Sequence, residues 1–319
     1  MVRGMSLVQV GARLLRTCMG LREGEALLVV TDNPTREIGE ALFDAGGQVG
    51  ARALLLLMAP TGRHGAEPPA PVAEAMKCAD VVVCPTQFSL THTQARLAAS
   101  RAGARIATMP GITREMFFTG AVSADYEAVA ERSRRVASML TAAGTARVAG
   151  PGWELRMSLE GRKAVASTGL YREKGESGNL PSGEAYIAPL EGTAEGEVVV
   201  DGSIAGMGKV QEPVRLVIHK GMLAAAEGPV GARLLELLGN APEARNVAEL
   251  GVGTNDKARV SGIVLEDEKI YGTVHLALGD NSTFGGNTKA GVHIDVVMLR
   301  PDLYLDDRLV ASGGQLLLS

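Results

Sequence analysis

The stretch Ala26-Leu27-Leu28-Val29-Val30 is a short, unbroken apolar run, which is typical of a parallel strand buried on both faces. It ends at Thr31-Asp32-Asn33-Pro34, a turn that can also cap the helix predicted over 36–45. Outward from this stretch, strands are predicted over 52–58, 81–84 and 105–109, and helices over 72–77 and 91–101. The alternation of strands and helices predicts a doubly wound α/β domain.

The pattern changes after Gly144, beyond a helix predicted over 126–143. Short strand-like runs then follow between glycines, interrupted by one helix over 232–238. We therefore expect an α/β fold with two domains. Residues 1–145 would form the doubly wound parallel-sheet domain and shape the substrate cleft, and residues 146–319 would form a strand-rich α+β domain that binds metal.

Composition narrows the classes of partner. The 319 residues include 46% hydrophobic residues, enough for two buried cores, and the net charge is −4. A single Trp, five Phe and no basic block argue against nucleic acid as a partner. No apolar stretch reaches the roughly 18–20 residues that cross a bilayer, and the N-terminus does not look like a signal peptide. Three cysteines without zinc-site spacing favour the cytoplasm.

Neither common nucleotide-binding motif is present. A Gly-x-Gly-x-x-Gly does not follow the first strand, and the Gly-x-x-x-x-Gly-Lys-Ser/Thr pattern is absent. The chemistry-bearing residues lie instead in the second half. His293 and Asp295 are two apart in a predicted strand and would face one cavity, although a buried His bonded to its neighbour is the alternative. His275 lies in a similar strand over 273–278.

Two acids extend this set. Glu249 lies within an apolar run, where a carboxylate must be paired or ligated unless it lies on an edge strand facing solvent. Glu184 follows a Pro-Ser-Gly turn and alone would be taken for a solvated loop acid. Five nitrogen and oxygen donors without sulfur suit Zn²⁺, Mn²⁺, Co²⁺ or Fe²⁺. The spacing leaves open whether one ion or two bind.

A glycine-rich polar loop over 276–287 directly follows His275. The loop could present its backbone N–H groups to a bound anion, or it could be only a tight connection between strands.

The order Glu, Glu, His, His-x-Asp resembles the aminopeptidase T and aminopeptidase S group of metallopeptidases. The matching segments are 179–184, 248–251, 275–279 and 293–295. The resemblance implies an α/β domain plus a strand-rich metal domain, a homodimer, and a co-catalytic metal pair. Its implied ligands are Glu184, Glu249, His275, His293 and Asp295. Iron-dependent dihydroxypyridine ring-cleaving dioxygenases form a second branch of the same superfamily and share the His-x-Asp element.

This chain departs from the peptidases at two positions. It has Ser282 where they carry a Tyr, and Ile270 where they carry a Glu, with Glu266 and Glu268 nearby but out of register. We therefore expect one tightly bound ion and a second that binds weakly or not at all.

The sequence thus predicts a cytoplasmic, metal-dependent aminopeptidase-like hydrolase that releases N-terminal amino acids from peptides. The metal would activate water, and Glu249 or Glu268 would take its proton. The first alternative is a mononuclear Fe(II) ring-cleaving dioxygenase of the dihydroxypyridine type, which would use His275, His293 and Asp295. The second is a binding protein that has kept the fold and lost the metal. A small peptide or another small molecule is the expected ligand.

Overall fold

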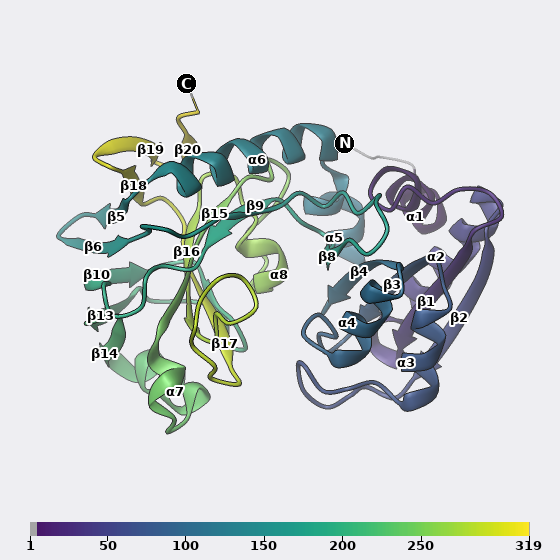
Figure 1. Ribbon diagram of the computed structural model, residues 1–319, viewed down its shortest axis with the longest axis horizontal. Helices are drawn as coiled ribbons and strands as arrows, with labels where there is room; N and C mark the ends of the chain where they lie inside the picture. Colours follow the sequence, from purple (N-terminus) through teal and green to yellow (C-terminus); the bar gives the residue numbers. More distant parts are fainter. Residues whose placement is uncertain (1–4, 319) are drawn as a thin grey trace. The chain divides into compact units, whose positions relative to one another are not determined.

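The computed structural model describes residues 5–318, which form two compact units (Figure 1). One unit contains residues 5–128 and the returning segment Gly169–Ser182, and the other contains Val129–Thr168 and residues 183–318. The functional division near residue 145 stays a prediction. None of the helices within residues 5–318 combines the length and the apolar character needed to span a bilayer.

The first unit is built on a five-stranded parallel sheet in the order β2-β1-β3-β4-β8. Strand β1 lies between β2 and β3, so the chain winds outward from it in both directions, as in other doubly wound sheets. The predicted parallel α/β fold is therefore confirmed. The strands are β1 (Ala26–Asp32), β2 (Arg52–Met58), β3 (Val81–Thr86), β4 (Arg105–Pro110) and β8 (Ser177–Asn179).

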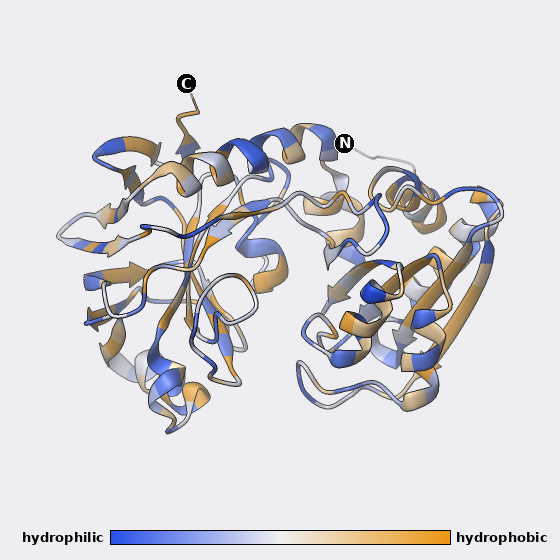
Figure 2. Ribbon diagram, in the orientation of Figure 1, coloured by the Kyte–Doolittle hydropathy of each residue, from blue (hydrophilic) through white to orange (hydrophobic). Residues whose placement is uncertain are grey.

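Helices precede and connect the strands of this unit; the sequence does not predict the first and the fifth of them, and it predicts the other four. They are α1 (Leu7–Thr17), α2 (Arg36–Val49), α3 (Ala70–Lys77), α4 (Gln94–Arg101) and α5 (Arg114–Thr119), and α6 (Tyr126–Ala142) begins here. Helix α2 runs four residues beyond its predicted end at Ala45. Gly46 lies within the helix and does not end it. A Cβ at this position would lie 2.4 Å from Leu27 Cδ2, so the glycine lets the helix pack closely on β1. The hydrophobic colouring of β1 and β2 in Figure 2 matches the apolar runs that predicted them.

The second unit contains two antiparallel sheets. The eight-stranded sheet has the order β14-β13-β10-β6-β5-β18-β19-β20, and the seven-stranded sheet has the order β12-β11-β17-β16-β15-β9-β7. The first comprises β5 (Thr145–Gly150), β6 (Trp153–Ser158), β10 (Glu195–Val200), β13 (Val214–His219), β14 (Met222–Ala226), β18 (Asp302–Leu305), β19 (Arg308–Ser312) and β20 (Gln315–Leu316). The second comprises β7 (Val165–Ser167), β9 (Glu184–Ile187), β11 (Ser203–Ile204), β12 (Gly208–Lys209), β15 (Val247–Gly253), β16 (Val274–Gly279) and β17 (His293–Met298). This unit also contains most of α6, together with helices α7 (Gly228–Leu238) and α8 (Val264–Asp267).

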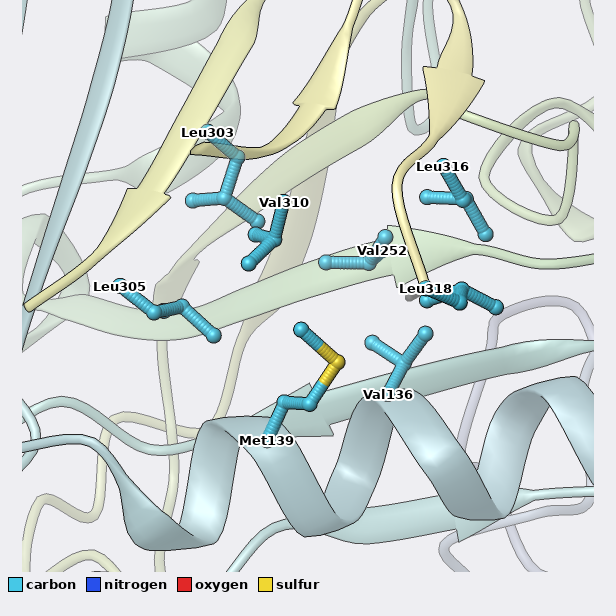
Figure 3. A pocket seen from close by; sticks show the side chains of 8 residues that line it. All are labelled: Val136, Met139, Val252, Leu303, Leu305, Val310, Leu316 and Leu318. Atoms are coloured by element: carbon cyan, nitrogen blue, oxygen red, sulfur yellow. The ribbon is translucent and has the colours of Figure 1, made fainter. Parts of the chain in front are cut away.

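One apolar core joins the two sheets. Alternate residues of the seven-stranded sheet enter this core, among them Leu250, Leu276 and Val296, which pack in one cluster with side chains of the eight-stranded sheet. The core is tightly closed: the apolar cavity of Figure 3, between Met139, Val252 and Leu303, measures about 10 Å³, room for about one water molecule. The intervening residues of β9, β15, β16 and β17 must then face the other side of the sheet.

Candidate metal centre

The second face of the seven-stranded sheet carries the polar residues. The strand register sets Glu184 opposite Gly253, and His275 opposite Gly251. It also sets Asp295 opposite Ala277, with His293 two residues earlier on the same strand. Since residues opposite one another in a sheet share a face, the ladder brings side chains from four strands together. The structure therefore gathers all five residues that the sequence singles out: Glu184, Glu249, His275, His293 and Asp295.

Gly251 makes room for the most deeply buried member of this group. A Cβ at position 251 would lie 2.0 Å from Nε2 of His275, so the imidazole rests on the bare backbone of the neighbouring strand. His275 is completely buried there. A glycine two residues after Glu249 thus determines where the imidazole lies.

The distances between donor atoms suit a shared cation. Nε2 of His275 lies 3.4 Å from Glu184 Oε2 and 3.3 Å from Glu249 Oε1. Nε2 of His293 lies 3.6 Å from Glu249 Oε2 and 3.3 Å from Asp295 Oδ1. Two donors that each lie about 2.1 Å from a metal ion, about 90–110° apart, are separated by about 3.0–3.4 Å. Each histidine nitrogen is therefore spaced from its carboxylate neighbours about as two ligands of one ion would be.

The donors fall into three overlapping groups whose ligand atoms lie within 4.8 Å of one another. The first is Glu184, Glu249 and His275; the second is Glu249, His293 and Asp295; the third is Glu268, His275 and Asp295. Glu249 links the first group to the second. Glu268, predicted as a proton acceptor, therefore belongs to the cluster although it follows α8 and lies outside the sheet.

The charges of the cluster also call for a cation. Burial lowers the pKa of His275, but Glu249, Glu184 and Glu268 outweigh it and raise this pKa to about 9. Burial also lowers the pKa of His293, but the carboxylates of Asp295 and Glu249 outweigh this effect and raise the pKa to about 10. In the protein without metal, protons thus compensate the carboxylates, and a divalent ion would displace them. The donors present therefore fit a divalent metal.

Glu268 and Asp295, which belong to one donor group, differ in ionisation. Burial raises the pKa of Glu268 to about 8, although Lys269 favours its charged form. Burial would also raise the pKa of Asp295, but the adjacent His293 lowers it to about 2. Of this pair, Asp295 is therefore the carboxylate held in the charged form that a metal requires, and Glu268 is the one able to exchange a proton near neutral pH.

Lys269 is a buried cation that the sequence did not single out. Its side chain is 1% exposed, and Nζ donates a hydrogen bond of 2.7 Å to Glu184 Oε1 and another to Glu268. Burial disfavours its charge, but the two carboxylates hold its pKa above the usual value. The ammonium is thus part of the centre.

The two histidines differ at their second nitrogen. Nδ1 of His293 donates to the carbonyl oxygen of Asp280 at 2.8 Å, if the proton is on that nitrogen, which leaves Nε2 free for a ligand. Within residues 5–318, Nδ1 of His275 has no hydrogen-bond partner. Only His293 therefore has the outer-shell bond that usually orients a metal-binding imidazole.

The glycine-rich loop after β16 is a tight connection. The backbone N–H groups of the connection between β16 and β17 are used within it: those of Ser282 and Ala290 donate to the Asp280 carboxylate, and that of Thr288 donates to Asn281 Oδ1. Glu191 fastens the loop from outside by accepting from the Asn287 backbone at 2.7 Å. Of the two readings of this loop, the strand connection is the one that the hydrogen bonds favour.

The loop also places an aromatic ring at the centre. Phe284 meets the ring of His293 edge-on at 5.8 Å and that of Tyr186 at 5.4 Å. Tyr186 follows Glu184 by two residues on β9 and therefore faces the same side of the sheet. The chain has only five Phe and five Tyr, and one of each lies here. That strand spacing could have identified Tyr186 from the sequence, whereas the positions of Phe284 and Lys269 depend on loop geometry.

Comparison with known proteins identifies the family. The family model for NicX, 2,5-dihydroxypyridine 5,6-dioxygenase, matches residues 6–318. The 2,5-dihydroxypyridine 5,6-dioxygenase of Pseudomonas putida KT2440 is 30% identical over 166 residues. That alignment covers 47% of this chain and 47% of the relative, so it spans about half of that protein's length.

Solved structures show the same fold. A 2,5-dihydroxypyridine dioxygenase structure from Pseudomonas putida KT2440 has a TM-score of 0.80 and 20% identity, and covers 98% of this chain and 96% of that one. AmpT from Thermus thermophilus has a TM-score of 0.72 and 16% identity, with 98% of each chain covered. Both branches named by the resemblance therefore share this fold.

The prediction that this protein is a hydrolase is wrong. A dioxygenase model matches nearly the whole chain, so neither the aminopeptidase function nor the classification as a hydrolase, metalloprotease or protease holds. The order of acids and histidines on which the resemblance rested led the sequence interpretation to the peptidase branch. The chain belongs to the 2,5-dihydroxypyridine 5,6-dioxygenase family.

Proposed function

We propose that this protein is an Fe(II)-dependent ring-cleaving dioxygenase that acts on a dihydroxylated pyridine or a closely related aromatic ring. The observation that carries the proposal is the aromatic wall of Phe284 and Tyr186 beside His293, within a cluster of nitrogen and oxygen donors. The name of the related Pseudomonas putida enzyme supplies the class of substrate.

His293 and Asp295 would hold the ion, with Glu249 or His275 completing the set. Bound iron would supply open coordination positions and the redox chemistry that O₂ activation requires. The donors include no sulfur, and imidazole with carboxylate suits Fe(II). The side chains of His293 and Asp295 are 26% and 16% exposed, so this end of the cluster is the one a substrate can reach.

The aromatic wall would orient the substrate ring. Phe284 and Tyr186 meet at an interplanar angle of 87°, so they offer an edge and a face, and aromatic rings favour such arrangements. A ring held there would present its hydroxyl groups toward His293 and Asp295. Glu268, whose carboxyl lies in one group with Asp295, is the proposed acceptor of a substrate hydroxyl proton.

The proposed reaction consumes one O₂ for each ring opened, and both oxygen atoms enter the product. It needs no external reductant. The test is to purify the protein without oxygen, load it with Fe(II), add 2,5-dihydroxypyridine and follow O₂ uptake. Mass spectrometry after reaction with ¹⁸O₂ should find two labelled atoms in the ring-opened product. Monohydroxylated pyridines serve as control substrates, and His293→Ala serves as the control variant.

Two results would contradict the proposal. The first is an absence of O₂ uptake by folded, iron-loaded protein with any dihydroxylated pyridine tried. The second is rapid release of leucine from leucine amide by the metal-loaded protein. The homodimer implied by the resemblance remains a separate proposal, which light scattering of the purified protein would test.

A further inference from the structure

The part of the β16–β17 loop that carries Phe284 has little apolar surface of its own. Residues 281–288, which we call the aromatic turn, contain Phe284 as their only hydrophobic residue, and the others are polar residues and glycines. Burial of apolar side chains can therefore contribute little to holding this turn in one conformation, and hydrogen bonds must fix it instead.

Two side chains from other loops supply such hydrogen bonds. Arg162 follows β6 and Glu191 follows β9, and the two form an ion pair whose side chains are 9% and 24% exposed. Arg162 donates a hydrogen bond to the carbonyl oxygen of Gly285. Oε1 of Glu191 accepts from the Asn287 backbone at 2.7 Å and from Asn281 Nδ2 at 3.0 Å. The pair therefore holds the aromatic turn at three points along its length.

The aromatic turn is shaped to receive these contacts. Asn281 is completely buried, and its Oδ1 accepts from the Thr288 backbone at 2.8 Å. A Cβ at Gly286 would lie 1.9 Å from Cγ of Asn281, so this amide rests on bare backbone. Burial would raise the pKa of Glu191, but hydrogen bonds from the aromatic turn lower it, so the carboxylate is ionised at neutral pH.

We propose that Arg162 and Glu191 form a clamp that keeps the ring of Phe284 beside His293 and thereby sets the affinity of the centre for an aromatic substrate. Neither side chain is among the metal-donor groups found within residues 5–318, so both are positioning residues that act through Phe284. The inference rests on the proposed function in one respect, namely that Phe284 faces the substrate ring.

The contacts that support His293 do not include the clamp. Nδ1 of His293 contacts the carbonyl oxygen of Asp280, which precedes the aromatic turn. The Asp280 carboxylate accepts its own hydrogen bonds, from the backbone of Ser282 and Ala290. Loss of the clamp should therefore release Phe284 while His293 keeps its support. This separation predicts a change in substrate affinity with little change in metal binding.

The first measurement needs neither iron nor substrate. The protein is labelled with 4-fluorophenylalanine, and the ¹⁹F signal of Phe284, one of five Phe, is assigned by its loss in Phe284→Tyr. In Arg162→Met and in Glu191→Ala this signal should move toward that of the free amino acid, because the ring leaves its two neighbouring aromatic rings. The matched control is Arg156→Met, at an arginine whose side chain is 63% exposed, and there the signal should stay in place.

The second measurement uses the iron-loaded protein. Arg162→Met should raise KM for 2,5-dihydroxypyridine about 3- to 10-fold, as expected for Phe284→Ala, with iron content and kcat per bound iron changed by less than about 2-fold. Adding Arg162→Met to Phe284→Ala should raise KM no further, because the clamp acts through this ring. Arg162→Lys keeps the charge but loses the planar fork of donors, so its KM should be intermediate.

Two results would overturn the inference. One is an unmoved Phe284 signal in folded Arg162→Met or folded Glu191→Ala, whatever the activity, and the second variant keeps this test open if the first does not fold. The other is a pair of KM effects that multiply in the double variant. If the signal moves as expected but the unaltered, iron-loaded protein does not react with dihydroxylated pyridines, the proposed function fails and the clamp stands.

Discussion

The two faces of the seven-stranded sheet use the same strands for opposite purposes. On one face, Leu250, Leu276 and Val296 join the common core. On the other, Glu249, His275 and Asp295 from the same three strands crowd their charges together. Successive residues of a strand point to opposite faces, so a shift of one residue would exchange the two sets. Along these strands, residues that stabilise the fold alternate with residues that carry the proposed chemistry. A substitution on one face therefore makes no direct contact with the side chains of the other face.

The largest expected difference between the faces follows from removing a ligand. His293→Ala should reduce metal affinity and dioxygenase activity by more than about 100-fold, while the protein stays folded, because this side chain is only partly buried and lies outside the core. Leu276→Ala on the core face should cost about 2–5 kcal/mol of unfolding free energy and leave the metal content of the folded fraction unchanged. Elemental analysis and denaturant titration measure the two effects. Full metal occupancy in His293→Ala would show that the polar face is not the ligand face.

A smaller effect is expected where the faces depend on the backbone. In Gly251→Ala the new Cβ would overlap the imidazole of His275, so this side chain must move. We expect a loss of about 10- to 100-fold in activity, comparable to the loss of a residue that supports a metal ligand. Gly47→Ala is a control at a helical glycine with nothing within 4 Å of its Cβ position and no left-handed backbone conformation. If Gly251→Ala keeps full activity, the position of His275 does not matter to the reaction.

The aromatic wall should affect the substrate more than the metal. Phe284→Ala removes the ring next to His293 and Tyr186, and we expect KM for the dihydroxylated pyridine to rise about 3- to 10-fold with metal content unchanged. Phe284→Tyr, which keeps the ring, is the matched control. Steady-state kinetics on iron-loaded protein would decide, and a fall in metal content with unchanged KM would move Phe284 from substrate binding to metal support.

The smallest expected effect is a difference in the pH dependence of stability. Around the polar face of the metal-free protein, carboxylates raise the pKa of His275 to about 9 and that of His293 to about 10, in spite of burial. Groups with raised pKa stabilise the fold fully below their unfolded pKa of about 6.5, and this contribution is lost as pH rises through the folded values. The melting temperature of the metal-free protein should therefore fall between pH 7 and 10.

Metal provides the control for that measurement. An ion on the polar face replaces the protons, so saturating metal should flatten the decline or reverse it. Leu276 lies in the apolar core cluster, on the opposite face from these imidazoles, so Leu276→Ala should lower the whole curve without changing its slope. Identical slopes with and without metal would argue against protons and metal competing for the same imidazoles.

Much of this arrangement can be predicted from local patterns. The apolar runs predict β1, β3 and the helices between them, because a parallel strand buried on both faces needs no partner information to be recognised. The two-residue spacing of His293 and Asp295 likewise predicts a shared face, and in the structure His293 Nε2 lies 3.3 Å from Asp295 Oδ1.

Other features depend on contacts between distant segments. Lys269 looks like a solvated residue in a charged stretch, and only the pairing of distant strands brings Glu184 to its ammonium. Strand β8 has three residues and joins the parallel sheet after an excursion of the chain into the second unit, so no periodicity announces it. The choice between hydrolase and dioxygenase fails for a similar reason, since the same kinds of ligand serve both reactions and the difference lies in neighbours that spacing does not reveal.

The close approach of His275 to the backbone at Gly251 limits which substitutions can occur at these two positions. Any larger residue at 251 would be tolerated only together with a smaller one at 275, because the two positions share one volume. Relatives of this chain should therefore change both positions together or neither. A mutagenesis library that varies only the side chains around the ion would omit Gly251, because glycine has no side chain, although this position determines where His275 lies.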